Sequence, residues 1–386
     1  MGLMTKTSSW HGEEHEIFTE SVRRFFDREM KPNIDRWIAD GCCDRDFWLR
    51  AGEAGLMGGS IPEEYGGSGG GFGFDSIVLY EQAACGDAGW GYGIQSIATH
   101  YILNYGSEDQ KAKWIPRLVT GRSIGALAMT EPGGGSDVQS IRTTAVKDGN
   151  QYRINGSKTF ITNGMTADLI VVATRTGNES GAKGISLVVV DTEETDGFRR
   201  GRKLEKMGLR GNDTAELFFD DAKIPMSHLL GQEEGQGFYQ MMRQLPWERL
   251  LIGITALGAM DLAVGMTADY AKQRKAFGQR IMDFQNTRFK LAEAKTKCEL
   301  LRSFVNDCIS RLEVKELDPA TASMAKYWGS QVQNEVMNEC LQLHGGYGYM
   351  SEFPISRLYT DARVQMIYGG TNEIMKELIA RSLDDR

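Results

Sequence analysis

The sequence lacks long apolar runs, and it lacks the features of a secretory leader. No run reaches the roughly 18 apolar residues that a membrane-spanning helix needs, so no membrane span is predicted. Residues 1–20 carry several charges and contain no apolar core, and we therefore expect that they do not act as a signal peptide.

Histidine and cysteine are also scarce. The chain has 5 histidines, none of them clustered, and 6 cysteines without the paired spacing of a metal site. No metal site is predicted, and a reduced, cytoplasm-like environment is the simplest interpretation. The cysteines are Cys42, Cys43, Cys85, Cys298, Cys308 and Cys340.

The chain has fewer basic residues than acidic ones, 44 against 52. A net charge of −8 and a pI near 5.4 argue against a nucleic acid or an anionic membrane surface as the main partner. The hydrophobic content of 41% and the charged content of 25% are those of an ordinary globular protein, and 386 residues are enough for two or three domains.

Changes in the residue pattern divide the chain into three predicted domains. Residues 1–122 are predicted to be helical, because residues such as Phe18, Val22 and Phe25 recur at helical spacing. Residues 123–238 contain short β-branched runs, and residues 239–386 return to helical periodicity. The predicted fold class is α+β multidomain, with an N-terminal helical domain, a middle β-barrel and a C-terminal four-helix bundle.

Turn signals refine this prediction. Asn155-Gly156 lies between two strand-like arms and predicts a hairpin turn. Residues 55–73 are rich in glycine but lack both the preceding strand and the spacing of a dinucleotide-binding loop, so a loop between helices is predicted.

The third segment has strong helix signals. Asp318-Pro319 is a typical helix start, and Gly345-Gly346 predicts that this helix ends in a left-handed cap. An apolar seam precedes it with alternating steps of three and four, which is typical of a bundle helix. The seam consists of Leu291, Ala294, Cys298, Leu301, Val305, Cys308 and Leu312.

A carboxylate, Glu248, lies inside the apolar segment 245–251. Pro246 fits the first turn of a helix, and this places Glu248 in that turn. The helix dipole favours a carboxylate there, so from spacing alone a surface carboxylate explains the pattern as well as a functional one.

Three further segments allow ligand binding, although each has an ordinary structural explanation. The glycine triplet 133–135, followed by Ser136, offers backbone N–H groups to a polar ligand or forms a plain turn. The Phe160 ring is expected either to stack on a planar ligand or to fill the core. Arg274 is expected either to bind a diphosphate or to belong to a solvated run of charged residues.

In their order along the chain, these segments resemble the acyl-CoA dehydrogenases. The resemblance rests on residues 130–137, 160–164, 273–278, 342–346 and 367–379, and it extends over essentially the whole chain. The segments 245–251 and 368–373 are most similar to those of the long-chain members of the family. The resemblance implies FAD-dependent α,β-dehydrogenation of an acyl-CoA, with a long acyl chain expected and a branched one also open.

The resemblance also implies where the catalytic base lies. Most members carry a glutamate in the loop where this chain has Gly369, and a minority, including the long-chain and isovaleryl types, carry it on the bundle helix. Gly369 has no side chain, so Glu248 is predicted to remove the α-proton while flavin N5 accepts the β-hydride. Glu248 is expected to be desolvated, with a raised pKa.

The family pattern assigns further residues to ligands. Phe160 stands where many relatives have tryptophan. The residues expected to bind FAD are Leu127, Met129, Thr130, Gly135, Ser136, Phe160, Ile161, Thr162, Arg274, Phe277, Gln285, Gln342, Leu343, His344, Gly345, Gly346, Thr371, Asn372 and Glu373. Those expected to bind the acyl-CoA substrate are Ser136, Tyr239, Pro246, Trp247, Arg249, Gly369 and Gly370.

The expected partners follow from the same resemblance. It implies a homotetramer, with electron-transfer flavoprotein as the electron acceptor, in the bacterial cytoplasm or in the mitochondrial matrix of a processed eukaryotic chain. Two alternatives remain open at this point. An acyl-CoA oxidase-like flavoenzyme would pass electrons to oxygen, and a DNA-binding damage-response relative would need a basic face, which the net charge of −8 disfavours.

Overall fold

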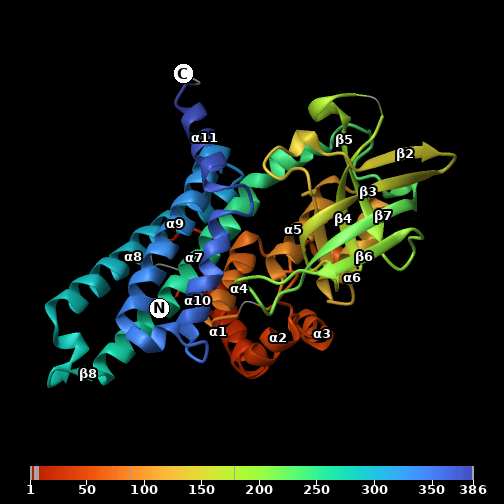
Figure 1. Cartoon of the computed structure of the whole chain (residues 1–386). Helices are drawn as coiled ribbons and strands as arrows, with labels where there is room; N and C mark the ends of the chain where they lie inside the picture. The colour runs from red at the N-terminus through yellow and green to blue at the C-terminus, as the bar shows by residue number, and fades with distance from the viewer. Residues whose placement is uncertain (1, 4–7, 88, 178, 385–386) are drawn as a thin grey trace.

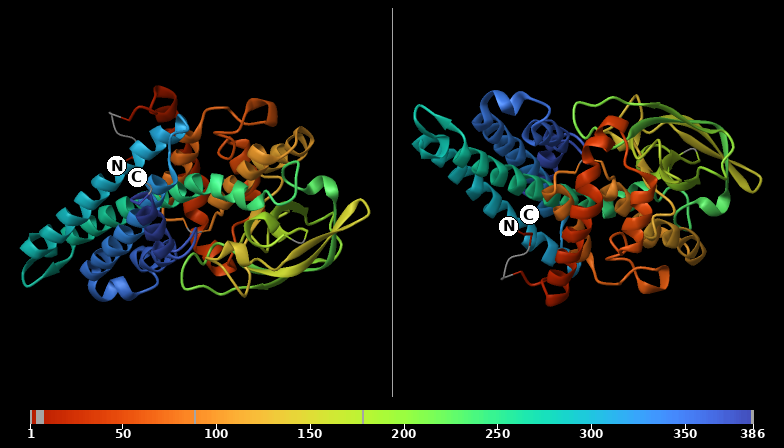
Figure 2. Two further views of the ribbon diagram at one scale, coloured as in Figure 1. Left: turned by 90° about the horizontal axis from the view of Figure 1, so that it is seen from above. Right: turned by 90° about the horizontal axis from the view of Figure 1, so that it is seen from below.

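The computed structural model describes residues 2–3, 8–87, 89–177 and 179–384. Figure 1 shows the three predicted regions in chain order: helices, a curled sheet, and a second group of helices. In both views of Figure 2, the N-terminal helices lie between the sheet and the long C-terminal bundle. The predicted fold class is confirmed.

The N-terminal region is helical, as predicted. Its helices are α1 (Glu13–Phe25), α2 (Ile34–Asp40), α3 (Arg45–Glu53), α4 (Phe72–Ala84), α5 (Tyr92–Tyr105) and α6 (Glu108–Val119). Val22 and Phe25 of α1 are buried, in agreement with the predicted stripe. The glycine-rich segment between α3 and α4 is a loop that contains one short 3₁₀ turn (Glu63–Tyr65).

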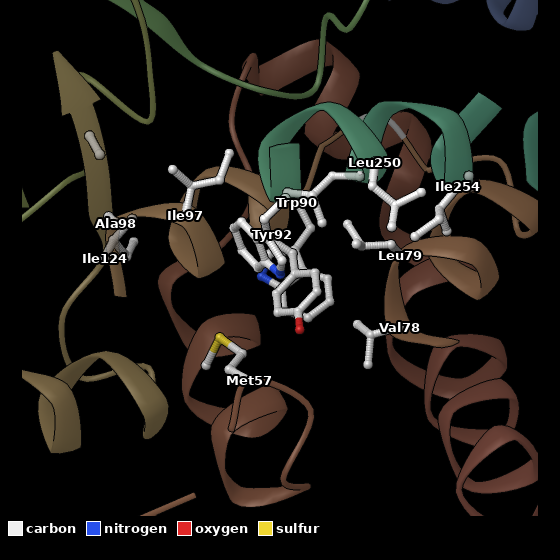
Figure 3. Close-up of a cluster of buried hydrophobic side chains, with 14 of the residues drawn as sticks. Met57, Val78, Leu79, Trp90, Tyr92, Ile97, Ala98, Ile124, Leu250 and Ile254 are labelled. Carbon is white, nitrogen blue, oxygen red and sulfur yellow. The ribbon is translucent and has the colours of Figure 1, made fainter. Parts of the chain in front are cut away.

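Aromatic and aliphatic side chains join this region to its neighbours. Trp90 stacks on Tyr92 with ring centroids 4.9 Å apart, and Figure 3 shows both rings among Leu79, Leu250 and Ile254. Because Leu79 belongs to α4 and Leu250 and Ile254 belong to the bundle, this core fixes the N-terminal helices against the bundle.

The middle region is one seven-stranded sheet with strand order β1-β4-β2-β3-β7-β6, in which β5 also pairs with β4. The strands are β1 (Gly125–Ala128), β2 (Thr144–Asp148), β3 (Gln151–Thr162), β4 (Leu169–Arg175), β5 (Ile185–Asp191), β6 (Phe198–Lys203) and β7 (Thr214–Pro225). The parallel pairing of β1 with β4 sets Leu127 opposite Val171. This pairing places the segment that follows β1 at one edge of the region.

The hairpin predicted at Asn155-Gly156 is wrong, because β3 runs straight through these residues. The turn between β2 and β3 is at Gly149 and Asn150, next to the pair Asp148 and Gln151. Asn155-Gly156 forms a bulge instead, where the register with β7 shifts. Glycine is needed there because its φ is 151° and a Cβ would lie 2.5 Å from the Thr143 hydroxyl oxygen.

The C-terminal region is built on three long helices, α7 (Gly237–Gln273), α8 (Gln285–Glu313) and α9 (Pro319–His344). A small hairpin, β8 (Lys275–Ala276) and β9 (Gln279–Arg280), joins α7 to α8. Two short helices, α10 (Pro354–Ala362) and α11 (Asn372–Ser382), pack on α9.

The local signals of α8 and α9 hold, with one exception. Six of the seven seam residues of α8 are buried, and Asp318 accepts hydrogen bonds from the N–H groups of Ala320 and Thr321, both at 2.9 Å. Gly345 ends α9 with the predicted positive φ of 59°, but its ψ of −138° lies outside the left-handed helical region.

The predicted start of α7 is wrong. The helix begins at Gly237, so Pro246 lies inside it and Glu248 is about three turns from its N-terminus. Pro246 cannot donate to the carbonyl of Met242, but packing on several sides keeps the helix continuous. By length and composition α7 is also apolar enough to cross a membrane, yet 72% of its most apolar window is buried within the protein.

Candidate active site

Glu248 lies in α7 and is buried, with only 7% of its surface exposed. The Tyr101 hydroxyl of α5 donates a hydrogen bond of 2.8 Å to its Oε1 atom. Burial raises the pKa of Glu248 to about 7, although the Tyr101 hydrogen bond and the Arg249 charge both act to lower it. A carboxyl group of this pKa exchanges protons readily near neutral pH, which is what a general base requires.

Aromatic rings surround the adjacent Trp247. Its ring lies 4.4 Å from the His100 ring and 5.5 Å from the Phe72 ring, measured between centroids. The His100 ring nitrogens pair with the Ser60 hydroxyl at 2.9 Å and with the Ser96 carbonyl at 2.8 Å. Trp247 therefore packs in an aromatic cluster directly next to Glu248 in the chain.

The loop before α11 lies against the same helix as Glu248. Gly369 has a φ of 63°, and a Cβ at this position would lie 2.6 Å from Cδ1 of Ile252, which is one turn beyond Glu248. A larger side chain at 369 would therefore be strained twice, by its backbone angle and by this contact. The structure brings Gly369 near the predicted base, while Pro246 and Trp247 are both buried beside that base.

Arg249 was predicted to bind the CoA portion of the substrate, but it is buried. The residue is 5% exposed, and its Nη1 atom donates to the Ser323 hydroxyl of α9 at 3.2 Å. Its Nε atom has no hydrogen-bond partner among the described residues. The side chain therefore lies within the bundle, and sequence reasoning could not place it there because α9 is far away in the chain.

The residues after β1 lie beside β3. The backbone N–H of Thr159 donates to the Thr130 carbonyl at 2.9 Å, and Leu127, Met129 and Thr130 are half-buried. Phe160 is 69% exposed and has a φ of 59°, so it is not a core residue. Of its neighbours in β3, Ile161 is buried and Thr162 is half-buried. A flat ring at the surface beside hydroxyl groups suits a planar aromatic cofactor.

A buried ion pair that the sequence did not predict holds the glycine-triplet loop. Lys158 is fully buried, and its Nζ atom donates to Glu131 at 2.8 Å and to the Met129 carbonyl at 3.0 Å. Glu131 also accepts from the N–H groups of Arg142 at 2.7 Å and Thr143 at 2.9 Å. These contacts fix the backbone that leads from β1 into the loop.

A cavity of about 510 Å³ lies beside this loop. It is lined by Glu131, Pro132, Gly133, Gly134, Asp137, Ser140, Arg142, Thr143, Gly156 and Ser157. The predicted ligand residues Gly135 and Ser136 do not line this cavity.

A second cavity, of about 580 Å³, lies where α7 and α9 end. It brings together Arg274 and the predicted segment 342–346, and it is also lined by Tyr270, Ile281, Tyr347 and Met350. The Tyr270 ring stacks on the buried His344 ring at 4.4 Å. An exposed cation beside backbone N–H groups and an aromatic wall fits a phosphate-bearing ligand.

Two predicted residues lie near this cavity but outside its lining. Phe277 is 96% exposed between β8 and β9, and Gln285 is the first residue of α8. Tyr239, predicted to bind substrate, is exposed near the start of α7. Within one chain, the structure does not bring these three side chains into a common site.

The start of α11 is anchored from inside the bundle. Thr371 caps the helix by accepting the Ile374 N–H at 3.3 Å. Asn372 is buried, and its Oδ1 atom accepts from Lys326 Nζ at 2.8 Å and from the Ser330 hydroxyl at 3.1 Å. The Asn372 side chain therefore faces the bundle core, while Glu373 is exposed.

The residues predicted for FAD fall into two groups that fit parts of that cofactor. Phe160, Thr130 and Thr162 fit a planar ring with hydrogen-bonding edges, and Arg274 with Gly345 and Gly346 fits a diphosphate. In Figure 1 the sheet and the β8 end of the bundle lie on opposite sides of the molecule. The two groups in one chain therefore do not face each other.

Comparison with known proteins matches every region of the chain to one family. Residues 12–122, 126–222 and 235–383 match the acyl-CoA dehydrogenase N-terminal, middle and C-terminal domains. The long-chain specific acyl-CoA dehydrogenase, mitochondrial, of Sus scrofa is 52% identical over 96% of this chain and 86% of its own length.

Solved structures agree with this match. The crystal structure of an acyl-CoA dehydrogenase from Geobacillus kaustophilus has a TM-score of 0.95 and 47% identity, covering 98% of this chain and 100% of its own. A glutaryl-CoA dehydrogenase from Mycobacterium smegmatis in complex with FADH2 has a TM-score of 0.91 and 28% identity, and the match covers 99% of this chain and 97% of that protein. A chain described with the electron transferring flavoprotein of Acidaminococcus fermentans has a TM-score of 0.94 and 33% identity, and the match covers 99% of this chain and 100% of that one.

The chain belongs to the acyl-CoA dehydrogenase family. It is a flavoprotein oxidoreductase of fatty acid oxidation, which uses FAD to dehydrogenate an acyl-CoA substrate. Its relatives include mitochondrial and bacterial proteins.

Proposed function

We propose that the protein oxidises long-chain acyl-CoA to trans-2-enoyl-CoA, with Glu248 as the base that removes the α-proton. The observation that carries this proposal is a buried carboxyl group of pKa about 7, set against a loop whose Gly369 has no side chain. Bound FAD would supply the acceptor for the hydride from the β-carbon. Glu248 then holds the α-proton, and the product leaves as the enoyl thioester.

Charge that develops on the thioester oxygen needs a donor. The N–H of Gly369 serves this role, because the loop lies against Ile252, one turn from Glu248. Gly370, also at positive φ, keeps the loop narrow. Pro246 and Trp247 shape the wall next to the reacting carbons, and Ser136 and Tyr239 contact the CoA portion from exposed positions. The positive charge of Arg249, within the bundle, acts to lower the pKa of Glu248.

Preference for a long chain is supported by the aromatic cluster around Trp247, next to the base, and by 52% identity to a long-chain specific relative. Methyl-branched acyl groups are the alternative substrates, although the Ile252 Cδ1 atom occupies the space beside Gly369. A panel of straight and branched acyl-CoA thioesters distinguishes these substrates.

A homotetramer explains the separation of the two groups of FAD residues. Residues 371–373 follow the Gly369 loop beside Glu248 and contribute from the same chain as that base. The cofactor's ring binds at Leu127, Met129, Thr130, Gly135, Ser136, Phe160, Ile161 and Thr162 of one chain, and the neighbouring chain contributes Arg274, Phe277, Gln285 and residues 342–346. Their placement at opposite ends of one chain supports this arrangement. The electron acceptor is an electron-transfer flavoprotein, and the compartment is the bacterial cytoplasm. Rapid release of peroxide in air, without such an acceptor, would point to an oxidase instead.

The test is anaerobic reduction of bound FAD by palmitoyl-CoA, followed by flavin absorbance. Wild-type protein is expected to bleach, and Glu248→Gln is expected to slow the reaction by at least about a hundredfold, since general-base catalysis supplies roughly 10²–10⁴-fold. The matched control is Glu316→Gln, which makes the same change at an exposed position between α8 and α9. Bleaching of Glu248→Gln at the wild-type rate contradicts the proposed base.

A further inference from the structure

Tyr101 contacts the carboxylate of Glu248 from another domain. It lies in α5, 147 positions from Glu248 in the chain, and it is fully buried. Its hydroxyl donates to Oε1 at 2.8 Å. Among the described residues this is the one hydrogen bond on the Glu248 carboxylate, so Oε2 has no partner within that part of the chain.

The two oxygens of the carboxylate differ, because one accepts a hydrogen bond from Tyr101 and the other does not. A carboxylate on a glutamate side chain has several rotamers, and ordering them costs free energy that a fixed partner removes. Tyr101 is itself held by burial and by its helix, with the Tyr105 ring 6.1 Å away. The phenol thus fixes Oε1, and Oε2 accepts no hydrogen bond from the described residues.

We propose that Tyr101 is a positioning residue of the reaction, which holds Oε1 of Glu248 so that Oε2 meets the α-proton of the thioester. This inference rests on the proposed role of Glu248 as base. Tyr101 touches the base and takes no proton itself, because its hydroxyl already serves as donor and burial raises its pKa well above the ordinary value. The proton goes from the α-carbon to Oε2, and the carbon's electron pair forms the new double bond as hydride leaves the β-carbon.

Other charged or titratable groups near Glu248 are few. Arg249 on α7 favours its ionised form, and Tyr105 on α5 faces it from the next turn. Lys326 on α9 lies beside Arg249, and His100 on α5 contacts Trp247. Of these groups, Tyr101 is the one that hydrogen-bonds to the carboxylate. Its removal should therefore affect both the orientation and the proton affinity of Glu248.

The experiment compares Tyr101→Phe with wild type as FAD-loaded enzyme and palmitoyl-CoA as substrate. Loss of a hydrogen bond to the ionised form should raise the pKa of Glu248, moving the acidic limb of kcat/KM up by about one pH unit. The rate of flavin reduction near pH 7 should fall about tenfold while KM changes less than twofold. Infrared titration of the protonated carboxyl band, identified by its loss in Glu248→Gln, reads the same pKa without turnover.

The matched control is Tyr105→Phe, which removes a phenol one turn further along α5. The Tyr105 hydroxyl donates to the Gln240 carbonyl at 3.0 Å and not to Glu248, so neither the acidic limb nor the infrared titration should move. A wild-type profile in Tyr101→Phe overturns the inference. So does a loss of rate with both pKa readings unchanged, which indicates a purely structural role.

Failure of the proposed base gives a different result. If Glu248→Gln reduces its flavin at the wild-type rate, Glu248 is not the base and Tyr101 positions nothing in the reaction. If Glu248→Gln is inactive but Tyr101→Phe matches wild type in rate, acidic limb and infrared titration, the base stands and the positioning role alone is rejected.

Discussion

At the scale of single residues, the main physical fact is the burial of an ionisable group without a full counter-charge. Glu248 keeps one phenol hydrogen bond and the nearby Arg249, and these do not offset the loss of hydration. An ionised Glu248 therefore destabilises the fold. A protein retains such a group when its proton chemistry is useful.

The cost of ionising Glu248 gives a prediction for stability. With a folded-state pKa of about 7 against an ordinary 4.5, ionisation costs up to about 3 kcal/mol of folding free energy, present above pH 7 and absent below about pH 4.5. Glu248→Gln keeps an oxygen that accepts from Tyr101 but has no charge. We expect a higher melting temperature than wild type at pH 8, with the difference shrinking as the pH falls to 5.5.

Calorimetric scans of both proteins at pH 8 and pH 5.5 check this result, with Glu316→Gln as the control for the substitution itself. Equal melting temperatures for wild type and Glu248→Gln at pH 8 would mean that Glu248 is not ionised at a cost in the folded protein, and the burial argument would then be incorrect.

Some of these residues were predictable from sequence, and some were not. The absence of a side chain at Gly369 and the carboxylate at 248 are both readable in the chain, and together they indicated the base. Tyr101 and the pair of Lys158 with Glu131 could not be found, because their partners depend on tertiary packing. The exposure of Phe160 decides between the two alternatives that the sequence left open, because a ring that is 69% exposed does not fill the core.

At the scale of elements, α7 and the start of α11 define the site. α7 carries Glu248 and Ile252 on neighbouring turns, and α11 begins directly after the loop of Gly369 and Gly370. The sequence predicted a helix that carries Glu248, but Pro246 led to a predicted start of α7 that is too late in the chain. Pro246 favours a helix start in isolation, and the packing of the longer helix outweighs that preference.

The buried Lys326 ties α9 to the first residue of α11. Burial lowers its pKa to about 8, although nearby Glu373 acts to raise it, and its Nζ atom donates to Asn372 at 2.8 Å. In Lys326→Met this hydrogen bond is lost while the side-chain volume is nearly kept. We expect a slower flavin reduction, because the loop before α11 becomes less well fixed, and little net change in stability, because removing a buried charge offsets the lost hydrogen bond.

Chemical denaturation and stopped-flow absorbance measure these two effects. Lys315→Met, at an exposed position after α8, is the control and should leave both unchanged. A Lys326→Met protein with the wild-type rate of flavin reduction would show that α11 is fixed by other contacts.

At the scale of the whole molecule, the two groups of proposed FAD residues lie at opposite ends of one chain. The order of the three regions was predictable from the change in residue pattern along the sequence. The distance between the sheet and the β8 end was not, because it depends on the lengths and directions of α7, α8 and α9. This separation supports the proposal that one FAD molecule binds between two chains.

Mixed assemblies test this sharing. Glu248→Gln lacks the base but keeps Arg274, and Arg274→Gln keeps the base but lacks the cation. If one chain's Arg274 serves its neighbour's site, co-expression of the two inactive variants should restore about a quarter of wild-type activity under random pairing. Each variant expressed alone is the control, with its FAD content measured. No recovery in mixed assemblies confirmed by mass spectrometry would place Arg274 within its own chain's site.

The central claim is that a carboxyl group with a pKa near 7 performs the first step of the reaction. The most direct measurement is kcat/KM for palmitoyl-CoA across pH 5–9 in the FAD-loaded enzyme. Because Glu248 must be ionised to accept a proton, we predict that activity falls tenfold per pH unit below an apparent pKa of about 7 and reaches a plateau above it. A profile that stays level down to about pH 5 would contradict the claim, since a buried Glu248 would then not be the base.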